Sequence, residues 1–254
     1  MRIVLITQND VFYLPRAISF LLANLPPHSQ IVGAVVNDVS PFGKRETTVQ
    51  KALKTWRIFG PRFFVHYAWR YLTAKLLGTD VVGTLAQHSI PLIDVKGNVN
   101  SEASLTAIRS YSPDLLISIA GNQIFRQPLI ELARHGTLNL HTALLPKYRG
   151  LMPSFWVLKN GETHTGVSVF FVNKGIDTGP ILVQRSIAIG NMSQEDLIRV
   201  TKELGMEAVI EAIKKIQHGD LTTLPNDDAQ SSYYSFPTRR DVIEFRRAGK
   251  KLYQ

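Results

Sequence analysis

LNLHTALLPKYRG, residues 138–150, holds the end of a predicted strand and the loop that follows it. Asn139 and His141 are two residues apart, so in a strand both side chains point to the same face. The loop must then leave the sheet through Pro146 and Gly150. An amide and an imidazole at one strand end are groups that can polarise a carbonyl, stabilise an oxyanion and move protons near neutral pH.

Short apolar runs and helical patterns alternate on the N-terminal side of this stretch. The runs predict strands over 2–7, 31–36, 90–95, 114–120 and 137–141, and the helical patterns cover 15–24, 104–111 and 127–134. This alternation predicts an α/β fold, a Rossmann-like, mostly parallel sheet with helices on both faces. Ligands of such sheets bind beyond the carboxyl ends of the strands. Asn139 and His141 are expected at such an end.

The pattern changes after Gly150. A helix over 153–160 leads to two strands over 165–172 and 181–189, joined by the turn NKGIDTGP, which carries Asp177. A long helix over 193–217 follows, with Ser193 as its N-cap. We therefore expect a catalytic domain over 1–190. Residues 191–254 form a short C-terminal extension, made of that helix and a basic tail with a helix near 241–249.

The formal charge of +9 is concentrated in two segments. Residues 44–75 carry eight Lys or Arg and one acid, a net +7, and residues 239–251 carry six and two, a net +4. Such clusters indicate anionic partners for these segments. The first cluster belongs to a basic, aromatic helical insert over about 44–77, which Gly60-Pro61 should divide into two helices. Its aromatic side chains could pack on the core, its arginines could cover a substrate diphosphate, or the insert could lie on an anionic membrane.

Several kinds of chemistry lack their signature. With no cysteine, disulfides and thiolate catalysis are excluded, which fits a reducing cytoplasm. The histidines show no metal-ligand spacing, so no metal is expected. There is no GxSxG, and no GxGxxG follows the first strand. No run is long and apolar enough to span a bilayer, and the N-terminus has no signal-peptide pattern. We expect a cytoplasmic protein.

The segment AGNQIF, residues 120–125, follows an apolar strand. It is either a plain turn that uses the freedom of glycine or a backbone-rich edge that hydrogen-bonds a flat heterocycle.

The runs NLHTALLPKYRG and TGVSVFFVNKGIDTGPILVQ resemble the formyltransferase superfamily that uses N10-formyltetrahydrofolate. The resemblance covers roughly residues 1–190 and is strongest over 113–184. It implies that Asn139, His141 and Asp177 are catalytic. It also implies a pterin pocket and no metal. The pocket residues would be Gly121, Asn122, Gln123 and Ile124, with Asn173, Gly175 and Ile176 in the flanking turn.

The resemblance implies formyl transfer to a primary amine and leaves the acceptor open. LITQNDVFYLP lacks the phosphate loop of glycinamide ribonucleotide enzymes, and only about 35 residues follow the last long helix, too few for the C-terminal domain of tRNA formyltransferases. A small amine is therefore expected, foremost a nucleotide-linked amino sugar. The alternatives are an aminoacyl-tRNA, which the basic segments favour, and a non-catalytic folate- or ligand-binding relative. The oligomeric state is left open.

Overall fold

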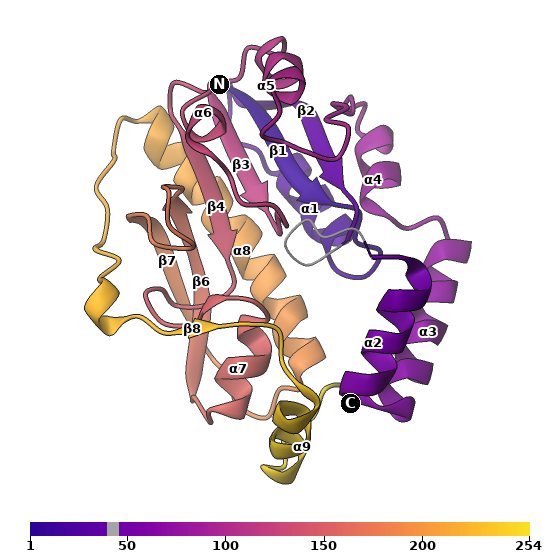
Figure 1. The fold of residues 1–254 in the computed structure, drawn as a ribbon. Helices are drawn as coiled ribbons and strands as arrows, with labels where there is room; N and C mark the ends of the chain where they lie inside the picture. Colours follow the sequence, from indigo (N-terminus) through magenta and orange to yellow (C-terminus); the bar gives the residue numbers. More distant parts are fainter. Residues whose placement is uncertain (40–45) are drawn as a thin grey trace.

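A six-stranded mixed sheet, in the order β2-β1-β3-β4-β6-β7, forms the centre of the molecule (Figure 1). The computed structural model describes residues 1–39 and 46–254, so Lys44 and Arg45 of the predicted insert lie outside the described residues. The strands are β1 (Arg2–Gln8), β2 (Gln30–Asn37), β3 (Leu115–Ile119), β4 (Thr137–His141), β6 (His164–Phe171) and β7 (Ile181–Ala188). The pairs among β2, β1, β3 and β4 are parallel, and β6 and β7 are antiparallel. The predicted α/β, mostly parallel sheet is confirmed.

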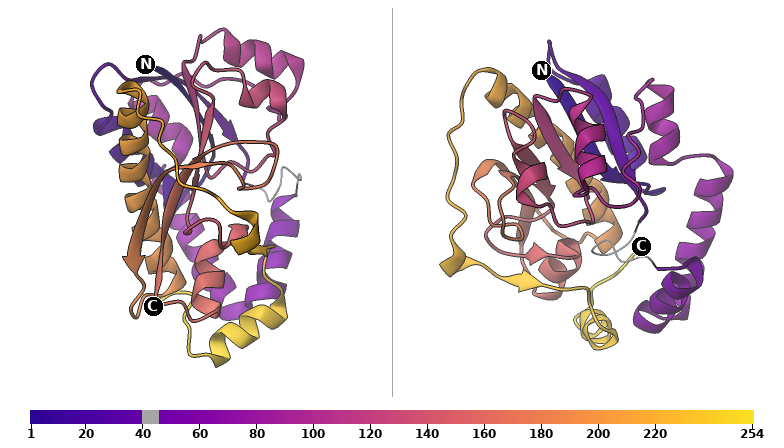
Figure 2. Two further views of the ribbon diagram at one scale, coloured as in Figure 1. Left: turned by 90° about the vertical axis from the view of Figure 1, so that its left-hand side faces the viewer. Right: turned by 45° about the horizontal axis from the view of Figure 1, so that its top comes forward.

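Helices cover both faces of this sheet (Figure 2). Alternate residues of β1 point to opposite faces, as strand geometry requires. Ile3 and Leu5 join a core with α1 (Leu14–Ala23) and α8 (Gln194–Gln217). Val4 and Ile6 join a second core on the other face, with α5 (Glu102–Arg109) and α6 (Gln127–Ile130). The four residues are fully buried, so β1 lies in the middle of the molecule.

The strand predicted over 90–95 is wrong. This segment follows α4 (Val81–Gln87) and touches the sheet edge through one bridge, between Leu92 and Ala34. The Ala34 N–H donates to the carbonyl of Pro91, and the Ile93 N–H donates to the Ala34 carbonyl. Pro91 has no N–H of its own to extend the ladder. The apolar character of segment 90–95 comes from Ile93 and Val95, which pack into a core cluster without forming a strand.

The predicted insert forms two helices, as Gly60-Pro61 indicated. α2 (Thr48–Phe59) begins at a capping box between Thr47 and Gln50, and α3 (Pro61–Leu76) begins directly after Gly60. The hairpin lies beside α9 at one side of the molecule, away from the central sheet (Figure 1). Of the residues in α2 and α3, all of which the structure describes, Phe59 alone is buried.

The C-terminal part packs on the rest of the molecule through α8, β8 and α9. After α7 (Pro153–Lys159), α8 begins at the predicted N-cap Ser193 and packs against β6 and β7. The tail then runs back past η2 (Asp228–Gln230), and β8 (Tyr233–Tyr234) pairs with β5 (Arg149–Gly150). α9 (Arg239–Arg247) closes it, with Phe245 stacked on Phe155. Within the described residues, no helix has the length and apolarity needed to cross a membrane.

Candidate active site

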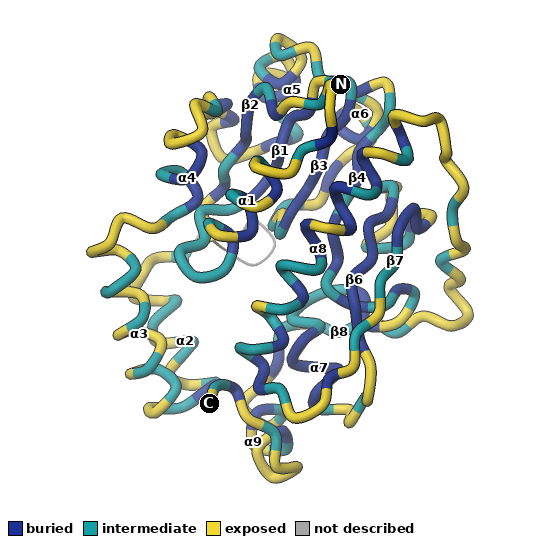
Figure 3. The backbone as a smooth tube through the Cα atoms, turned by 180° about the vertical axis from the view of Figure 1, so that it is seen from behind, coloured by how far each residue is buried: buried dark blue, intermediate teal, exposed yellow. Residues whose placement is uncertain are grey.

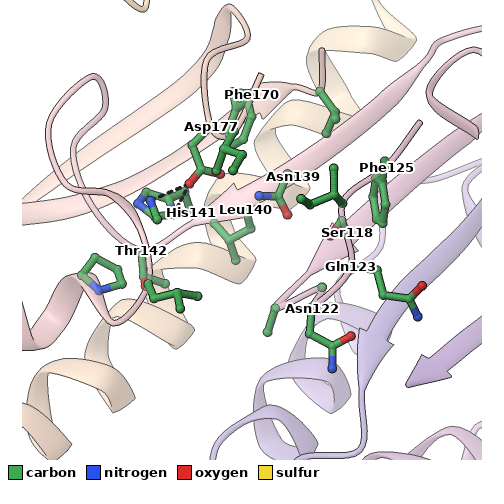
Figure 4. Close-up of a pocket in the computed structure, with 18 of the residues that line it drawn as sticks. Ser118, Asn122, Gln123, Phe125, Asn139, Leu140, His141, Thr142, Phe170 and Asp177 are labelled. Carbon is green, nitrogen blue, oxygen red and sulfur yellow. Dashed lines mark hydrogen bonds and ion pairs between the residues drawn. The ribbon is translucent and has the colours of Figure 1, made fainter. Parts of the chain in front are cut away.

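A cavity of about 410 Å³ opens at the carboxyl ends of β1, β3 and β4. Asn139, His141 and Asp177 line it together (Figure 4). The two segments predicted to flank a pterin, 121–124 and 173–176, supply further walls through each of the seven residues named from the sequence. The fold therefore brings all ten predicted site residues to one place.

Asn139 and His141 lie on the same face of β4, as their spacing predicts. Their neighbours Leu138 and Leu140 point to the other face, into the core with α1 and α8. Ser118 on β3 and Phe170 on β6 stand opposite Asn139 in the sheet. Asn139 is half-buried and His141 is buried, so the amide is open to the cavity and the imidazole forms part of its wall.

One hydrogen bond of His141 defines the protonation of one ring nitrogen. Nε2 lies 2.7 Å from the carbonyl oxygen of Tyr148. A carbonyl can only accept, so Nε2 carries a proton and donates. The other nitrogen, Nδ1, lies 3.8 Å from Oδ2 of Asp177. A neutral ring would present a lone pair to that carboxylate, whereas a doubly protonated ring presents a positive charge. The Tyr148 carbonyl and the Asp177 carboxylate thus face the two ring nitrogens of His141.

Asp177 is placed by a loop that folds back along β4. Val172 donates its N–H to the Thr137 carbonyl at the start of β4, yet Asp177 lies beside His141 at the end of that strand. Its Oδ2 accepts a 2.9 Å hydrogen bond from the Gly150 N–H, and its φ of +54° lies in the left-handed region, which aspartate tolerates.

Gly150 meets two requirements that no other residue type can satisfy together. Its φ is +94°, which favours glycine. A Cβ at this position would lie 2.3 Å from the Tyr234 carbonyl oxygen. The close approach of β8 and the hydrogen bond to Asp177 both depend on this bare backbone.

Tyr148, whose carbonyl accepts the hydrogen bond from His141, is itself held by a hydrogen bond of its side chain. Its hydroxyl donates a 2.6 Å hydrogen bond to Oε1 of Glu162. Burial is the larger cause, and this bond the second, of a raised pKa of Tyr148. The hydroxyl therefore stays protonated, and its bond to Glu162 persists, across the neutral range. The backbone of Tyr148 also has a left-handed φ of +60°. Such outliers persist only where surrounding structure enforces them.

Asn226, in the C-terminal tail, fixes the turn that carries Asp177. Its Nδ2 donates to the carbonyl oxygens of Asp177 and Gly179, at 2.9 and 2.8 Å. Its Oδ1 accepts from Nη2 of the buried Arg149, at 2.8 Å. Sequence reasoning missed this residue, because one asparagine in a polar tail carries no pattern that points to a turn 49 residues away.

Asn226→Ala is expected to lower kcat about tenfold while leaving donor binding nearly unchanged. Two carbonyls would lose their donor, which costs about 1–3 kcal/mol per buried group, and Asp177 would no longer be held at one position. Steady-state kinetics and calorimetric titration of a folate measure the two effects. Gln230→Ala is the matched control, because that amide belongs to the same tail and bonds only Asp227 there. Equal kinetics in both variants would contradict the role given to Asn226.

The segment 121–124 presents backbone and one apolar side chain to the cavity. Both ends of the Gln123 side-chain amide already have hydrogen-bond partners: Nε2 donates to Oδ1 of Asn37 at 3.0 Å, and Oε1 accepts from the Val99 N–H at 3.2 Å. Asn122 donates to the Asp38 carbonyl. Ile124 is 55% exposed and offers an apolar edge. The two amides brace neighbouring loops, so the backbone is the part of this segment that is free to bind.

The unusual backbone angle in this segment falls on Ala120, with φ +57°, and not on Gly121. Glycine is needed at 121 for another reason. A Cβ there would lie 2.5 Å from Oγ of Ser118, a distance that real Cβ atoms do not show.

Hydrogen bonds of the Asn173 side chain hold the turn 173–176. Oδ1 of Asn173 accepts from the Gly175 N–H at 3.1 Å and from Oγ1 of Thr178 at 2.6 Å. Ile176 is 38% exposed and adds a second apolar edge to the cavity. In the described part of the chain, no three His, Cys, Asp or Glu side chains are grouped as metal ligands.

A second cavity of about 390 Å³ lies between α1, α3 and α8. Lys202 on α8 lines both cavities. Three arginines of the second cavity have carboxylate partners, in the pairs Arg70–Glu195, Arg16–Glu203 and Arg199–Asp196. No ion pair of Lys202 occurs among the residues that the structure describes, and burial lowers its pKa, with Asp10 opposing. In the sequence, Lys202 resembles an ordinary solvated lysine of a long helix, so sequence reasoning missed it.

Comparison with known proteins adds to this geometry. Residues 76–213 match the model of the family described as formyl transferase. The methionyl-tRNA formyltransferase of Geobacter metallireducens is 38% identical over 170 residues, which are 66% of this chain and 54% of that protein. That of Kosmotoga olearia is 35% identical over 173 residues, again 54% of its length. The chain thus spans about half the length of these relatives.

Solved structures share the fold at low identity. A sugar N-formyltransferase from a Shewanella species has a TM-score of 0.62 and 17% identity, covering 98% of this chain and 87% of its own. The N-formyltransferase from Helicobacter canadensis, in complex with folinic acid and dTDP-3-aminofucose, has a TM-score of 0.58 and 18% identity, covering 94% and 71%. The family model spans the β3–β4 cavity walls, the Asp177 turn and most of α8, and the chain belongs to the formyl transferase family.

Proposed function

We propose that this protein transfers a formyl group from N10-formyltetrahydrofolate to a primary amine. The observation that carries the proposal is the meeting of an amide, an imidazole and a carboxylate, Asn139, His141 and Asp177, in one cavity. Family membership supports it, since relatives of this chain are formyltransferases. A non-catalytic role would leave these three polar groups in the cavity without a use.

The reaction needs one nucleophile, one oxyanion site and one proton transfer. The unprotonated amine attacks the formyl carbon, a C–N bond forms, and the carbonyl oxygen becomes an oxyanion. Asn139 donates to that oxyanion, and the imidazolium charge of His141 stabilises it. The bond to N10 then breaks and its electron pair stays on N10, which takes the proton that the amine loses. Asp177 relays this proton through water. The products are the N-formyl amine and tetrahydrofolate.

The donor would lie against the backbone of 121–124 and the turn 173–176. A pterin is flat and carries several hydrogen-bonding groups, which suits a backbone edge between the apolar Ile124 and Ile176. The Helicobacter canadensis relative is solved with folinic acid, a 5-formyl folate.

Thermal stability in the presence of 5-formyltetrahydrofolate tests the donor site. Saturating ligand is expected to raise Tm by mass action. Gly121→Ala should lose this shift, because its Cβ meets Oγ of Ser118. The double variant Ser118→Ala/Gly121→Ala removes the clashing oxygen and should regain most of the shift, with Ser118→Ala as the control. Absence of any shift in the unaltered protein would contradict the donor assignment.

For the acceptor we favour a nucleotide-linked amino sugar. Lys202 stands where the two cavities meet, and its unpaired ammonium, disfavoured by burial, would gain from an anion. A sugar diphosphate extends an amine and an anionic group over two adjoining cavities. The Helicobacter canadensis protein is in complex with dTDP-3-aminofucose, a nucleotide-linked amino sugar.

Lys202→Gln is expected to raise the KM of such an acceptor about tenfold or more with little change in kcat. A hydrogen bond to a charged group contributes about 1.5–3 kcal/mol, and about 1.4 kcal/mol corresponds to a factor of ten. Lys214→Gln, on an exposed position of the same helix, is the control. If KM did not change, the anion would have to bind elsewhere.

The second candidate acceptor is an aminoacyl-tRNA, because the Geobacter metallireducens and Kosmotoga olearia relatives are methionyl-tRNA formyltransferases. Assay of the purified protein with N10-formyltetrahydrofolate against nucleotide-linked amino sugars, other small amines and initiator methionyl-tRNA separates the two. Turnover on tRNA should fall steeply with salt, because phosphate contacts release counterions, whereas turnover on a sugar nucleotide should not. If only tRNA were formylated, the amino-sugar proposal would be overturned. If none of the acceptors were formylated, the proposal that the protein is an enzyme would be overturned.

A further inference from the structure

The outer face of α3 carries an exposed apolar stripe. Val65, Trp69, Leu72 and Leu76 follow one another at intervals of four, three and four residues, so they share one side of the helix. Their exposed fractions are 63%, 69%, 56% and 86%, and Leu77, directly after the helix, is 77% exposed. Single exposed apolar residues are ordinary, but a row of four along three turns is not.

The opposite side of α3 already has its packing partners. Phe63 stacks with Tyr67 and contacts Tyr253, and Tyr67 packs on Phe12. The helix is therefore anchored by one face, and its outer stripe does not contribute to the fold. Figure 3 shows α2 and α3 as exposed and intermediate positions almost throughout.

Positive charge surrounds the stripe without negative charge to balance it. There is no acidic residue from Thr47 to Thr79. By helical spacing, Arg62 lies along one margin of the stripe and Lys75 along the other. The described residues give neither of them an ion-pair partner, in contrast to Arg70, which pairs with Glu195 on the inner side. α2 adds exposed Val49 and Leu53 together with Arg57.

We propose that the α2–α3 hairpin binds the surface of an anionic phospholipid bilayer, with α3 lying in the plane of the interface. An apolar stripe with a tryptophan, bordered by Arg and Lys, is the pattern of such helices. The apolar side chains would enter the acyl boundary while Arg62 and Lys75 reach the anionic headgroups. This surface is separate from the cavity of Asn139, His141 and Asp177, so the inference does not depend on the proposed reaction.

Charge and layout favour a bilayer over the other occupants. A nucleic acid would need cations along the centre of the face, where this helix has Val65, Leu72 and Leu76. A second copy packed face to face would bring Arg62 and Lys75 of both copies together with no acid between Thr47 and Thr79 to neutralise them. An anionic surface complements both the apolar centre and the basic margins.

Co-sedimentation with vesicles tests this inference. The protein should bind vesicles of equal parts phosphatidylcholine and phosphatidylglycerol, bind pure phosphatidylcholine at least tenfold more weakly, and dissociate as salt is raised. Trp69→Glu/Leu72→Glu should lower binding to anionic vesicles at least tenfold. Leu221→Glu/Ile243→Glu, which changes two exposed apolar residues outside the hairpin, should bind normally.

A second pair of variants tests the charges without touching the stripe. Arg62→Gln/Lys75→Gln should weaken binding several-fold, and Lys250→Gln/Lys251→Gln in the basic tail should not. Circular dichroism and Tm establish that each variant is folded. The inference is overturned if anionic vesicles are not bound, or if the control pairs lose as much binding as the hairpin pairs. It is also overturned if Trp69→Glu instead dissociates a dimer, or lowers affinity for RNA, in a protein that ignores vesicles.

Discussion

His141→Ala is expected to lower kcat by about 10²- to 10³-fold, the usual loss when one group that stabilises an oxyanion is removed. The imidazole stands between the Tyr148 carbonyl and the Asp177 carboxylate, and alanine would remove the ring that the proposed mechanism places beside the oxyanion. Donor affinity should change little, because the walls formed by 121–124 and 173–176 remain. Single-turnover kinetics with the preferred acceptor, beside calorimetric titration of 5-formyltetrahydrofolate, measure both quantities.

His164→Ala is the matched control for this change. That histidine is exposed at the start of β6, and its Nδ1 lies near only the neighbouring Thr163 hydroxyl. Its removal should leave kcat within a factor of about two, as for an ordinary surface substitution. Near-normal turnover in His141→Ala, in a protein with unchanged Tm, would sink the proposed mechanism.

Asp177→Asn is expected to lower kcat by about 10- to 100-fold, since a hydrogen bond or ion pair to a charged partner is worth about 1.5–3 kcal/mol. Asparagine keeps an oxygen that can accept from the Gly150 N–H, and it tolerates the left-handed φ of this position. The substitution therefore removes charge while retaining geometry. Asp177→Ala removes both, and its kcat should be lower still.

The comparison of the two Asp177 variants distinguishes charge from position. Equal losses would mean that the carboxylate acts only by its negative charge, and a loss confined to Asp177→Ala would mean that it acts only as a structural acceptor. The latter result would contradict the ion pair with His141. Asp220→Asn serves as control: the partners Lys215 and Thr222 hold the pKa of this exposed carboxyl at about 2, and it lies far along the chain from the turn.

The C-terminal tail makes the site depend on residues remote in sequence. Asn226 holds the Asp177 turn, and Arg149, next to Gly150, holds Asn226. β8 pairs with β5 at the same loop. A change in the tail can therefore alter turnover without touching the cavity, which is the result expected for Asn226→Ala.

Local sequence determined the six strands of the central sheet and the side on which their residues lie. A strand repeats every two residues, so the spacing of Asn139 and His141 was enough to place them on one face, with Leu138 and Leu140 on the other. The break at Gly60-Pro61 and the N-cap Ser193 were equally predictable, because capping and helix termination depend on a few neighbouring residues. These features are set by short-range sterics and hydrogen bonds.

The glycine turn points to Asp177 and family resemblance to the other site residues beyond β4, but the contacts of all of them required the folded chain. Periodicity gives no distance between His141 and Asp177, which a folded-back loop brings to 3.8 Å. It gives no sign of Asn226, of Lys202 between two cavities, or of Pro91 limiting its segment to one bridge. Contacts between segments far apart in the chain arise from the packing of all elements at once, and no local pattern encodes them. The tertiary structure alone decided which polar groups meet.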